Sequence, residues 1–396
     1  MGDPFAHYKE LPFFEGSHAD LCHRVAAWAE EVLGKFPHGH PASEAACREM
    51  VRSLGQAGWL AYTVGGKAYG GVEEGIGVRA VCLIREVLAY HSGLAEFAFA
   101  MQGLGSGPIT LYGTPEQKRR YLPRVAAGEA VAAFALSEPG AGSDAAALTC
   151  RAYLDGEAFV LEGEKAWVSN GGIADFYVVF ARLEPGAGGQ GISAFLVDAG
   201  TEGLAVEQVE VVAPHPLAKL VFRGCRIPRS KLLGSPGQGL RIAMETLDIF
   251  RVTVAAAALG FAKRALDEAL QYALDRKMFG TTLARMQATR TKLGDIATEL
   301  EASALLTYRA AWLKDRGHRA TREVAMAKLY ATERAQAIVD AAVQLMGGEG
   351  VRKGGVLEAL YREIRPLRIY EGASEVQRLI VAREILRERG EEVGVR

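Results

Sequence analysis

The segments AFVLEGEKAWVS at 158–169, FYVVFARL at 176–183 and ISAFLVD at 192–198 decide the fold class. Each is short and rich in β-branched and aromatic residues, and Gly, Pro, Asp and Asn separate them, which is typical of strands. The segment AKLVF at 218–222 continues the pattern. We therefore expect a small β domain over residues 131–233.

Helical patterns lie on both sides of this β domain. From about residue 18 to 130, apolar residues recur at intervals of three and four, as in AVCLIREVLAYHSGLAEFAFAMQ at 80–102. Within this stretch, Thr114-Pro115-Glu116-Gln117 has the composition of a helix start. After the β domain, alanine-rich stretches predict helices over 240–275, 285–316 and 321–346, the last ending at Gly347-Gly348.

The order of these elements predicts a mainly α protein with a central β domain. We expect a helical domain at 1–130, the β domain at 131–233 and a helical bundle at 234–396. Hydrophobic residues make up 49% of the 396 residues and charged residues 23%, which is the profile of a globular protein. The chain is too long for one ordinary core, in agreement with several domains.

Charge and cysteine content exclude several classes of protein. Forty-six Lys and Arg face 47 Asp and Glu without a polybasic block, so nucleic acid is not an expected partner. The five cysteines are scattered singly without the spacing of metal ligands, so we expect no metal site and a reducing compartment. The sequence has neither a signal peptide pattern nor an uncharged apolar run of 18 residues, so we expect a cytoplasmic protein with no membrane association.

Two glycine runs imitate a dinucleotide-binding fingerprint. Gly186, Gly188 and Gly191 match G-x-G-x-x-G, but a predicted strand follows them, whereas the phosphate site requires a helix N-terminus. The run at 103–107 follows a helical pattern and meets Pro108. We interpret both as turns and expect no Rossmann domain.

Two segments could contact a flat polar ligand, and each also has an ordinary structural explanation. SEPGAGSD at 137–144 combines small residues with hydroxyls, so that backbone N–H groups could approach a ligand closely, although a surface turn has the same composition. EKAWVSNGG at 164–172 places Trp167 and Ser169 on one face of a strand. A tryptophan in a strand more often belongs to the core.

The segment RIYEGASEVQRLIVAREIL at 368–386 contains a candidate base. The spacing of Ser374 and Gln377 fits a capping box, so we expect a helix to begin at Ser374. Glu371 then lies in the preceding turn, next to Gly372, which can adopt unusual backbone angles. A carboxylate in this position either complements the helix dipole or takes part in chemistry.

Two neighbouring features favour chemistry. Ile369 and Tyr370 flank Glu371, and apolar surroundings raise the pKa of a carboxyl, which makes it a better base near neutral pH. Arg383 lies seven residues after Val376 on the otherwise apolar face of the helix, where a cation needs an anionic partner.

On these residues the chain resembles the acyl-CoA dehydrogenases over nearly its whole length. The matching segments are GTPEQKRRYLP (113–123), SEPGAGSD (137–144), EKAWVSNG (164–171), LDxxR (247–251), RKMFG (276–280), QLMGGEG (344–350) and IYEG (369–372). Seven matches in order are highly specific. The resemblance implies an N-terminal helical domain, a small barrel-like β domain and a C-terminal four-helix bundle.

The resemblance also implies FAD, lying between the bundle and the β domain. The flavin ring would contact Phe134, Leu136, Ser137, Gly142, Ser143, Trp167 and Ser169, with Ser137 near its reactive nitrogen. Further cofactor contacts would come from Arg276, Phe279, Gln287, Gln344, Gly347, Gly348, Ala373 and Glu375. Because some of these act across a subunit interface in relatives, the resemblance implies an obligate homo-oligomer, typically a tetramer built of two dimers.

For the substrate, the resemblance implies the thioester of an acyl group with CoA. Its ligands would be Ser143, Asp248, Arg251, Tyr370, Gly372 and Arg383. Glu371 would take a proton from the carbon next to the carbonyl, while a hydride leaves the β-carbon for flavin N5. The product would be a trans-2-enoyl-CoA, with electrons passing to an electron-transferring flavoprotein in fatty acid β-oxidation.

Some relatives carry the base on the helix with LDxxR, immediately before the Arg, but that position is Phe250 here, so Glu371 is the sole candidate. Three features depart from the family pattern. Ala373 replaces a common Thr, Phe134 replaces a common Tyr, and VVAPHPLAKLVF at 211–222 lacks the K-x-G-x-R pattern. The last departure leaves the substrate class open.

Two alternatives keep the same fold. One is a flavin oxidase or monooxygenase, in which reduced flavin meets oxygen; the base argues against a monooxygenase but does not separate an oxidase from a dehydrogenase. The other is a scaffold without catalysis. The length of the acyl chain is not readable from the sequence.

Overall fold

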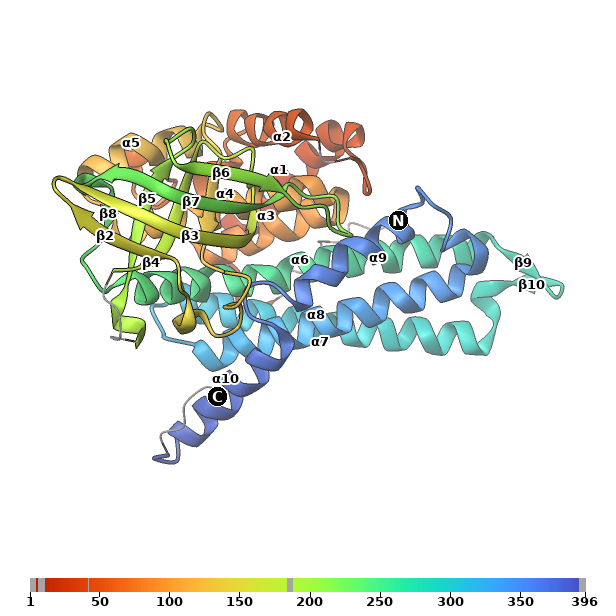
Figure 1. The fold of residues 1–396 in the computed structure, drawn as a ribbon. Helices are drawn as coiled ribbons and strands as arrows, with labels where there is room; N and C mark the ends of the chain where they lie inside the picture. Colours follow the sequence, from red (N-terminus) through yellow and green to blue (C-terminus); the bar gives the residue numbers. More distant parts are fainter. Residues whose placement is uncertain (1–4, 6–10, 42, 184–187, 392–396) are drawn as a thin grey trace. The chain divides into compact units, whose positions relative to one another are not determined.

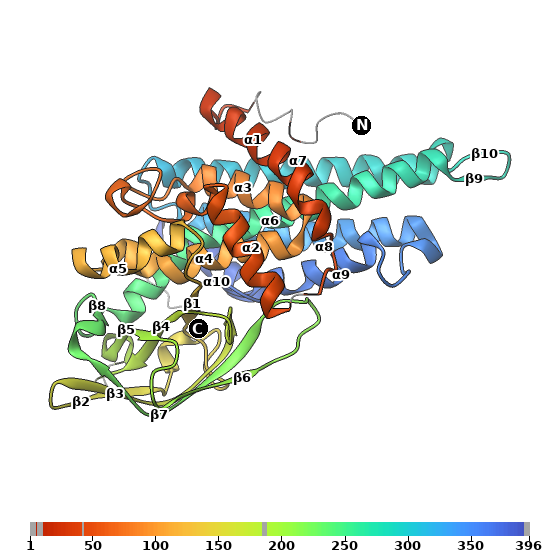
Figure 2. The same cartoon turned by 90° about the horizontal axis from the view of Figure 1, so that it is seen from above.

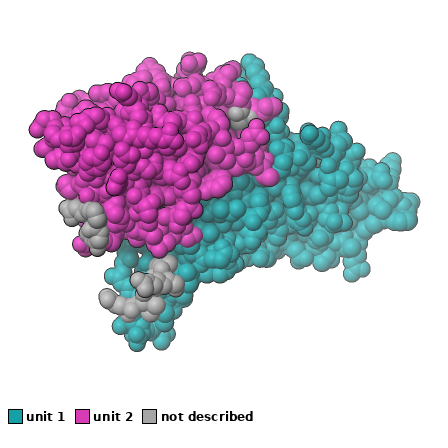
Figure 3. Space-filling model, viewed as in Figure 1, with its two compact units in different colours: residues 1–40, 78–96, 251–396 teal, residues 41–77, 97–250 magenta. Residues whose placement is uncertain are grey.

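The computed structural model describes residues 5, 11–41, 43–183 and 188–391. These residues form two compact units (Figure 3). Unit 1 comprises residues 1–40, 78–96 and 251–396, and unit 2 comprises residues 41–77 and 97–250. Each unit combines stretches that are far apart in sequence, so the linear boundaries at 1–130, 131–233 and 234–396 stay a prediction.

Unit 2 contains an eight-stranded sheet (Figure 1). Its strand order is β6-β7-β3-β2-β4-β5-β8, with β1 beside β4. The pairs β3–β7 and β4–β5 are antiparallel, which confirms that this is no Rossmann sheet. The strands are β1 (Ala132–Ala135), β2 (Arg151–Asp155), β3 (Ala158–Ser169), β4 (Phe176–Arg182), β5 (Ile192–Asp198), β6 (Leu204–Gln208), β7 (Leu217–Pro228) and β8 (Leu232–Leu233).

Strand β3 ends irregularly at the tryptophan that the sequence singled out. The register against β7 shifts between Lys165 and Val168, and Trp167 has a left-handed φ of 58°. As a result the indole is 62% exposed, while the next residue, Val168, is buried. Trp167 is therefore not a core tryptophan.

The helices of unit 2 correct one prediction. Residues 103–107 form no turn but lie inside α4 (Gly93–Tyr112), where a Cβ on Gly103 would come within 2.4 Å of the Phe250 ring. These glycines serve close packing within unit 2. Gly186 lies outside the described residues, and Gly188–Gly191 forms a single 3-10 turn before β5. The other helices with residues in unit 2 are α2 (Glu44–Gln56), α5 (Pro115–Ala126) and the first part of α6 (Gly239–Asp275).

Unit 1 is helical apart from one short hairpin. Its long helices α7 and α8 lie side by side, and α9 and α10 pack against α8 (Figures 1 and 2). Helix α8 stops at Met346 because Gly347 has a φ of 60°, as the Gly-Gly pair predicts. The elements are α1 (Gly16–Val32), α3 (Val78–His91), the second part of α6, β9 (Lys277–Met278), β10 (Thr281–Thr282), α7 (Gln287–Asp315), α8 (Thr321–Met346), α9 (Val356–Ile364) and α10 (Ser374–Arg387).

Helix starts test the capping predictions. The predicted helix start at Thr114 is confirmed, and the structure adds that Thr114 caps α5 reciprocally with Gln117. Helix α10 begins at Ser374 as predicted, but the capping box there is wrong, because Ala373 is the N-cap. The Ser374 hydroxyl instead donates to the Glu333 carboxylate at 2.5 Å, a distant partner that outcompetes the local amide.

In the described part of the chain, every helix is either too short or too polar to cross a bilayer.

The α5 cap gives a local stability test. Thr114→Ala removes the acceptor of the Gln117 amide at 3.2 Å and should weaken the first turn by about 1 kcal/mol. We expect its amide protons to exchange with solvent about fivefold faster. Arg119→Ala, at an exposed position of the same helix, is the matched control, and equal exchange in both variants would contradict the cap.

Candidate active site

The turn before α10 has an unusual backbone. Glu371 and Gly372 both lie in the left-handed region, with φ of 52° and 93°. A φ of 93° is one that L side chains rarely adopt, so a side chain at Gly372 would strain the backbone. A non-glycine residue such as Glu371 is costly in this region, on the order of 1–3 kcal/mol, and persists only where the surroundings hold it.

Three side chains hold this turn through its carbonyl oxygens. Arg251 Nε donates to the Glu371 oxygen at 3.0 Å, and Lys328 Nζ donates to the Gly372 oxygen at 2.8 Å. Gln377 Nε2 also donates to Gly372 at 2.9 Å. The donors come from α6, α8 and α10, so three helices of unit 1 fix the turn. Arg251 was a predicted site residue, whereas Lys328 and Gln377 were not.

The carboxylate of Glu371 is buried and has no hydrogen-bond partner among the described residues. Its side chain is 4% exposed, and both oxygens are buried. Burial raises its pKa, whereas the nearby cations Arg85, Arg251 and Lys328 oppose the rise. The predicted direction is confirmed, although Ile369 is 58% exposed and is not part of an apolar enclosure.

The nearest cation is one that the sequence reasoning missed. Arg85 Nη1 lies 4.0 Å from Glu371 Oε1, and the guanidinium is fixed by Nε to Glu96 at 2.5 Å and Nη1 to Thr253 at 2.7 Å. Its Nη2 donates to the Tyr370 hydroxyl at 3.3 Å. The available signal was three charges, Arg85, Glu86 and Glu96, inside the apolar helical pattern at 80–102.

The predicted substrate ligands are only partly brought together. Tyr370, Gly372 and Arg251 surround Glu371 within unit 1. Arg383 does find an anionic partner, but it is the adjacent Glu384, at 3.1 Å. Asp248 and Ser143 lie in unit 2, where Asp248 is half-buried and Ser143 is exposed.

In unit 2, a buried ion pair supports the predicted flavin loop. Lys165 Nζ contacts Glu138 Oε1 at 2.7 Å and donates to the Leu136 oxygen at 3.0 Å. Glu138 also accepts from the amides of Thr149 and Cys150. The loop is joined to β3 by the Ala166 amide, which donates to the Ser137 oxygen at 2.9 Å. The ion pair was not predicted.

The surface next to this loop suits a planar cofactor. Trp167 presents its indole two residues after the buried Lys165, and Gly142 and Ser143 are exposed. Phe134 and Ser169 are half-buried, and Leu136 is buried. An exposed aromatic plane beside fixed, accessible backbone is what a flavin requires.

The remaining predicted cofactor residues lie in unit 1. Arg276 and Phe279 belong to the hairpin of β9 and β10, and Phe279 is 88% exposed with a φ of 50°. Gln287 begins α7, and Gln344, Gly347 and Gly348 are exposed at the end of α8. Ala373 caps α10, and Glu375 is exposed in its first turn.

The atypical segment at 211–222 is ordered against α4. His215 stacks on Phe97 with ring centroids 4.2 Å apart, and the Pro216 oxygen accepts the Asn170 amide at 3.0 Å. The segment therefore adjoins the end of β3 through Asn170, three residues after Trp167.

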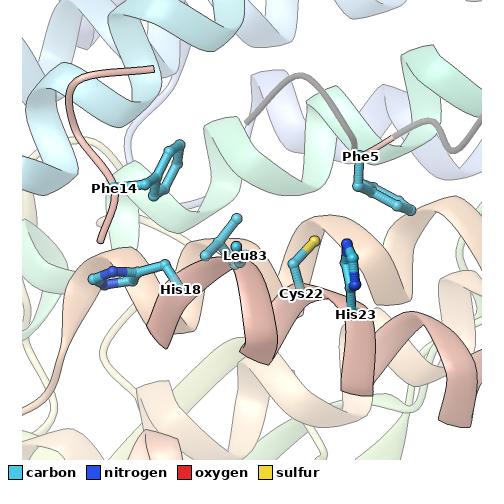
Figure 4. Close-up of a pocket in the computed structure, with 7 residues that line it drawn as sticks. Phe5, Phe14, His18, Cys22, His23 and Leu83 are labelled. Atoms are coloured by element: carbon cyan, nitrogen blue, oxygen red, sulfur yellow. The ribbon is translucent and has the colours of Figure 1, made fainter. Parts of the chain in front are cut away.

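A cavity of about 10 Å³ near α1 holds at most one water molecule (Figure 4). None of the residues that line this cavity is a predicted site residue. The lining consists of Phe5, Phe14, His18, Ala19, Cys22, His23 and Leu83. Within the described ranges, His, Cys, Asp and Glu form no cluster of three or more placed to hold a metal ion.

Comparison with known sequences accounts for this combination of elements. Three protein-family models match the sequence: "Acyl-CoA dehydrogenase, N-terminal domain" over residues 16–129, "Acyl-CoA dehydrogenase, middle domain" over 133–225 and "Acyl-CoA dehydrogenase, C-terminal domain" over 237–386. The chain belongs to the acyl-CoA dehydrogenase family. It is accordingly an FAD-dependent oxidoreductase, and the predicted fold of helices, β domain and helices is confirmed.

Individual relatives of this acyl-CoA dehydrogenase differ in the activity that their names state. The mitochondrial short-chain specific acyl-CoA dehydrogenase of Bos taurus is 42% identical over 356 residues, covering 88% of this chain and 84% of the relative. A 3-(aryl)acrylate reductase of Clostridium sporogenes is 38% identical, covering 95% and 100%. A chain in the structure of the electron transferring flavoprotein of Acidaminococcus fermentans has a TM-score of 0.88 and 34% identity, covering 94% and 99%.

Lys328 makes stability depend on pH. Burial lowers the pKa of Lys328 to about 8 from 10.5, with Glu371 opposing, so between these values the unfolded chain binds more protons than the folded one. Stability should therefore rise from pH 8 toward 10.5. Relative to Lys328→Met, we expect the wild-type Tm to gain about 2 °C or more over this range. Calorimetry with Lys292→Met as an exposed control checks this; a constant Tm difference would refute it.

Lys165 should control FAD retention. Lys165→Met removes the hydrogen bond to the Leu136 oxygen and leaves Glu138 without its cation. The loop at 136–144 should therefore become more mobile. We expect faster amide exchange there and a severalfold lower ratio of flavin to protein absorbance after purification. Lys219→Met, which removes a half-exposed lysine of β7, should keep its flavin. Full occupancy in Lys165→Met would show that the loop does not depend on the pair.

Proposed function

We propose that this enzyme dehydrogenates acyl-CoA thioesters between the α- and β-carbons, with Glu371 as the base. The observation that carries the proposal is the buried carboxylate of Glu371, which has no hydrogen-bond partner among the described residues and a raised pKa. A structural carboxylate would be expected to have its oxygens satisfied. One that is buried, on a fixed turn and without a protein hydrogen-bond partner among the described residues is suited to accept a proton from a substrate.

Glu371 and the residues around it would have different roles in the reaction. The carboxylate takes the α-proton, and the backbone N–H at Glu371 polarises the thioester carbonyl, which otherwise leaves that proton far too weakly acidic. Arg251 and Lys328 keep the turn in place through the Glu371 and Gly372 oxygens. FAD, when bound, supplies the acceptor for the hydride from the β-carbon. The product is a trans-2-enoyl-CoA.

The cofactor contacts follow the positions already described. In unit 2, Trp167, Ser169 and the loop from Phe134 to Ser143 would contact the flavin, supported by the exposed indole and the anchored loop. In unit 1, the FAD of a neighbouring subunit would be bound by Arg276, Gln287, Gln344, Gly347 and Gly348. Further cofactor contacts would come from Phe279, Ala373 and Glu375. The exposed Phe279 side chain supports a contact made by this hairpin, and the homotetramer stays a prediction.

Similarity to a short-chain specific enzyme supports a short acyl group as the substrate. Similarity to a chain in an electron transferring flavoprotein structure supports such a flavoprotein as the electron acceptor. Tyr370, Gly372, Arg251, Asp248, Ser143 and Arg383 are the proposed CoA-thioester ligands. The roles in β-oxidation and the cytoplasmic location stay predictions.

A second candidate is the reverse direction, reduction of a 2-enoyl substrate. The similarity to a 3-(aryl)acrylate reductase favours it. Two anaerobic mixtures measure which half-reaction the protein supports: oxidised enzyme with butyryl-CoA, and enzyme first reduced with dithionite and then mixed with crotonyl-CoA, each followed by the flavin spectrum. Flavin oxidation by crotonyl-CoA without reduction by butyryl-CoA would favour the reductase.

Glu371→Gln tests the base directly. The amide cannot accept the α-proton, so the variant should bind FAD and butyryl-CoA while anaerobic bleaching of the flavin slows by at least about a thousandfold. Glu301→Gln, which changes an exposed carboxylate on α7 outside the proposed site, is the matched control and should bleach normally. Substantial bleaching by Glu371→Gln would show that another group is the base.

Reoxidation separates the dehydrogenase from an oxidase. After anaerobic reduction by butyryl-CoA, the flavin of a dehydrogenase should reoxidise slowly in air and rapidly with an electron-transferring flavoprotein. Rapid production of hydrogen peroxide in air would contradict the dehydrogenase.

A further inference from the structure

Charged side chains from four helices face the carboxylate of Glu371. Arg251 and Lys328 each use a donor on a backbone oxygen of the turn around Glu371. Arg85 differs, because its guanidinium lies beside the carboxylate itself, 4.0 Å from Oε1. The charged groups are Arg85 on α3, Glu96 on α4, Arg251 on α6, Lys328 on α8 and Glu371, with the Tyr370 hydroxyl completing the set.

The distance between Arg85 and Glu371 is informative. At 4.0 Å it is too long for a hydrogen bond but short enough for attraction between two buried charged groups. Attraction favours the ionised carboxylate. The absence of a hydrogen bond leaves both oxygens of Glu371 available to a substrate proton.

Arg85 is held at this distance by other contacts. Its side chain is 1% exposed, and Glu96, Thr253 and Tyr370 each bind a different part of the guanidinium edge. Glu96, at 2.5 Å from Nε, is the only carboxylate among these three and is also buried. Without it, the guanidinium would be drawn toward Glu371 and could close the remaining gap.

We propose that the buried Arg85–Glu96 pair positions a cation beside Glu371 without bonding to it, so that the base is ionised in the free enzyme and still able to accept the substrate proton. This rests on the proposed role of Glu371. Arg85 and Glu96 are positioning residues, since they act through Glu371 and set the pH at which the reaction begins.

The surrounding charges agree with this assignment. Burial raises the pKa of Glu371; Arg85 is the strongest opposing influence, followed by Arg251 and Lys328, whereas Glu96 acts in the same direction as burial. Farther out, Glu363 faces Glu96, and Glu333 faces Lys328. Removal of Arg85 and removal of Glu96 should therefore shift the titration of Glu371 in opposite directions.

The experiment compares wild type, Arg85→Gln, Arg85→Lys and Glu96→Gln. The holoenzymes are mixed anaerobically with limiting butyryl-CoA between about pH 5.5 and 9, and the second-order rate of flavin bleaching reports ionisations of the free enzyme. In such a profile the acid limb is the pH range over which the rate rises as Glu371 ionises. For Arg85→Gln, we expect this limb to move to higher pH by about one unit or more. The rate should be about tenfold lower than that of wild type on the acid side of the limb and should recover at high pH. Arg85→Lys keeps the charge and should stay closer to wild type.

Glu96→Gln should move the acid limb to lower pH and lower the plateau rate, because a more strongly stabilised carboxylate is a weaker base. A merely structural role would lower the rate at all pH values without moving the limb. If Arg85→Gln does not fold, Arg85→Gln combined with Glu96→Gln removes the pair without leaving one charge unpaired, and its limb should still lie above that of wild type.

Unmoved acid limbs in these variants would overturn the inference, as would shifts in the same direction for Arg85→Gln and Glu96→Gln. Glu371→Gln distinguishes this failure from failure of the proposed function. If Glu371→Gln does not bleach and the limbs stay fixed, only the role of the pair is wrong. If Glu371→Gln bleaches normally, the base itself is wrong.

Discussion

The carboxylate of Glu371 is buried without a hydrogen-bond partner among the described residues, on a left-handed backbone turn. Both features oppose folding, since a buried charge needs compensation and a left-handed glutamate is strained. The compensation comes from cations on three helices: Arg85, Arg251 and Lys328. Unit 1 is therefore organised around one group whose own contacts are left incomplete.

In unit 2 as well, a buried cation holds a segment of irregular backbone. Trp167 is also left-handed, and it follows a buried lysine, Lys165, whose ammonium binds a carbonyl oxygen of the adjoining loop and the carboxylate of Glu138. In both places an ammonium group from a regular helix or strand fixes irregular backbone. Rigid elements thus hold the parts that would contact ligands, which gives geometry that a free loop does not have.

Local patterns predicted much of this structure. The strands and long helices follow from their periodicity, and Glu371 was found because it precedes a helix start. The failures have particular causes. Gly103 looked like a turn because composition does not distinguish a turn from a helix packed closely on Phe250. The cap at Ser374 failed because Glu333, 41 residues away, takes its hydroxyl. Arg85 is 286 residues from Glu371, so nothing local joins them.

The central claim is that Glu371 is a buried carboxylate that ionises above its ordinary pKa of 4.5 and is free to take a proton. An infrared pH titration of the resting enzyme, read as the difference between wild type and Glu371→Gln, observes the protonated carboxyl of this residue directly. The account predicts a protonation midpoint above 4.5. From the proposed role of Arg85 beside the carboxylate, it also predicts an ionised form in alkali. A midpoint at or below 4.5, or a carboxyl that stays protonated in alkali, would contradict it.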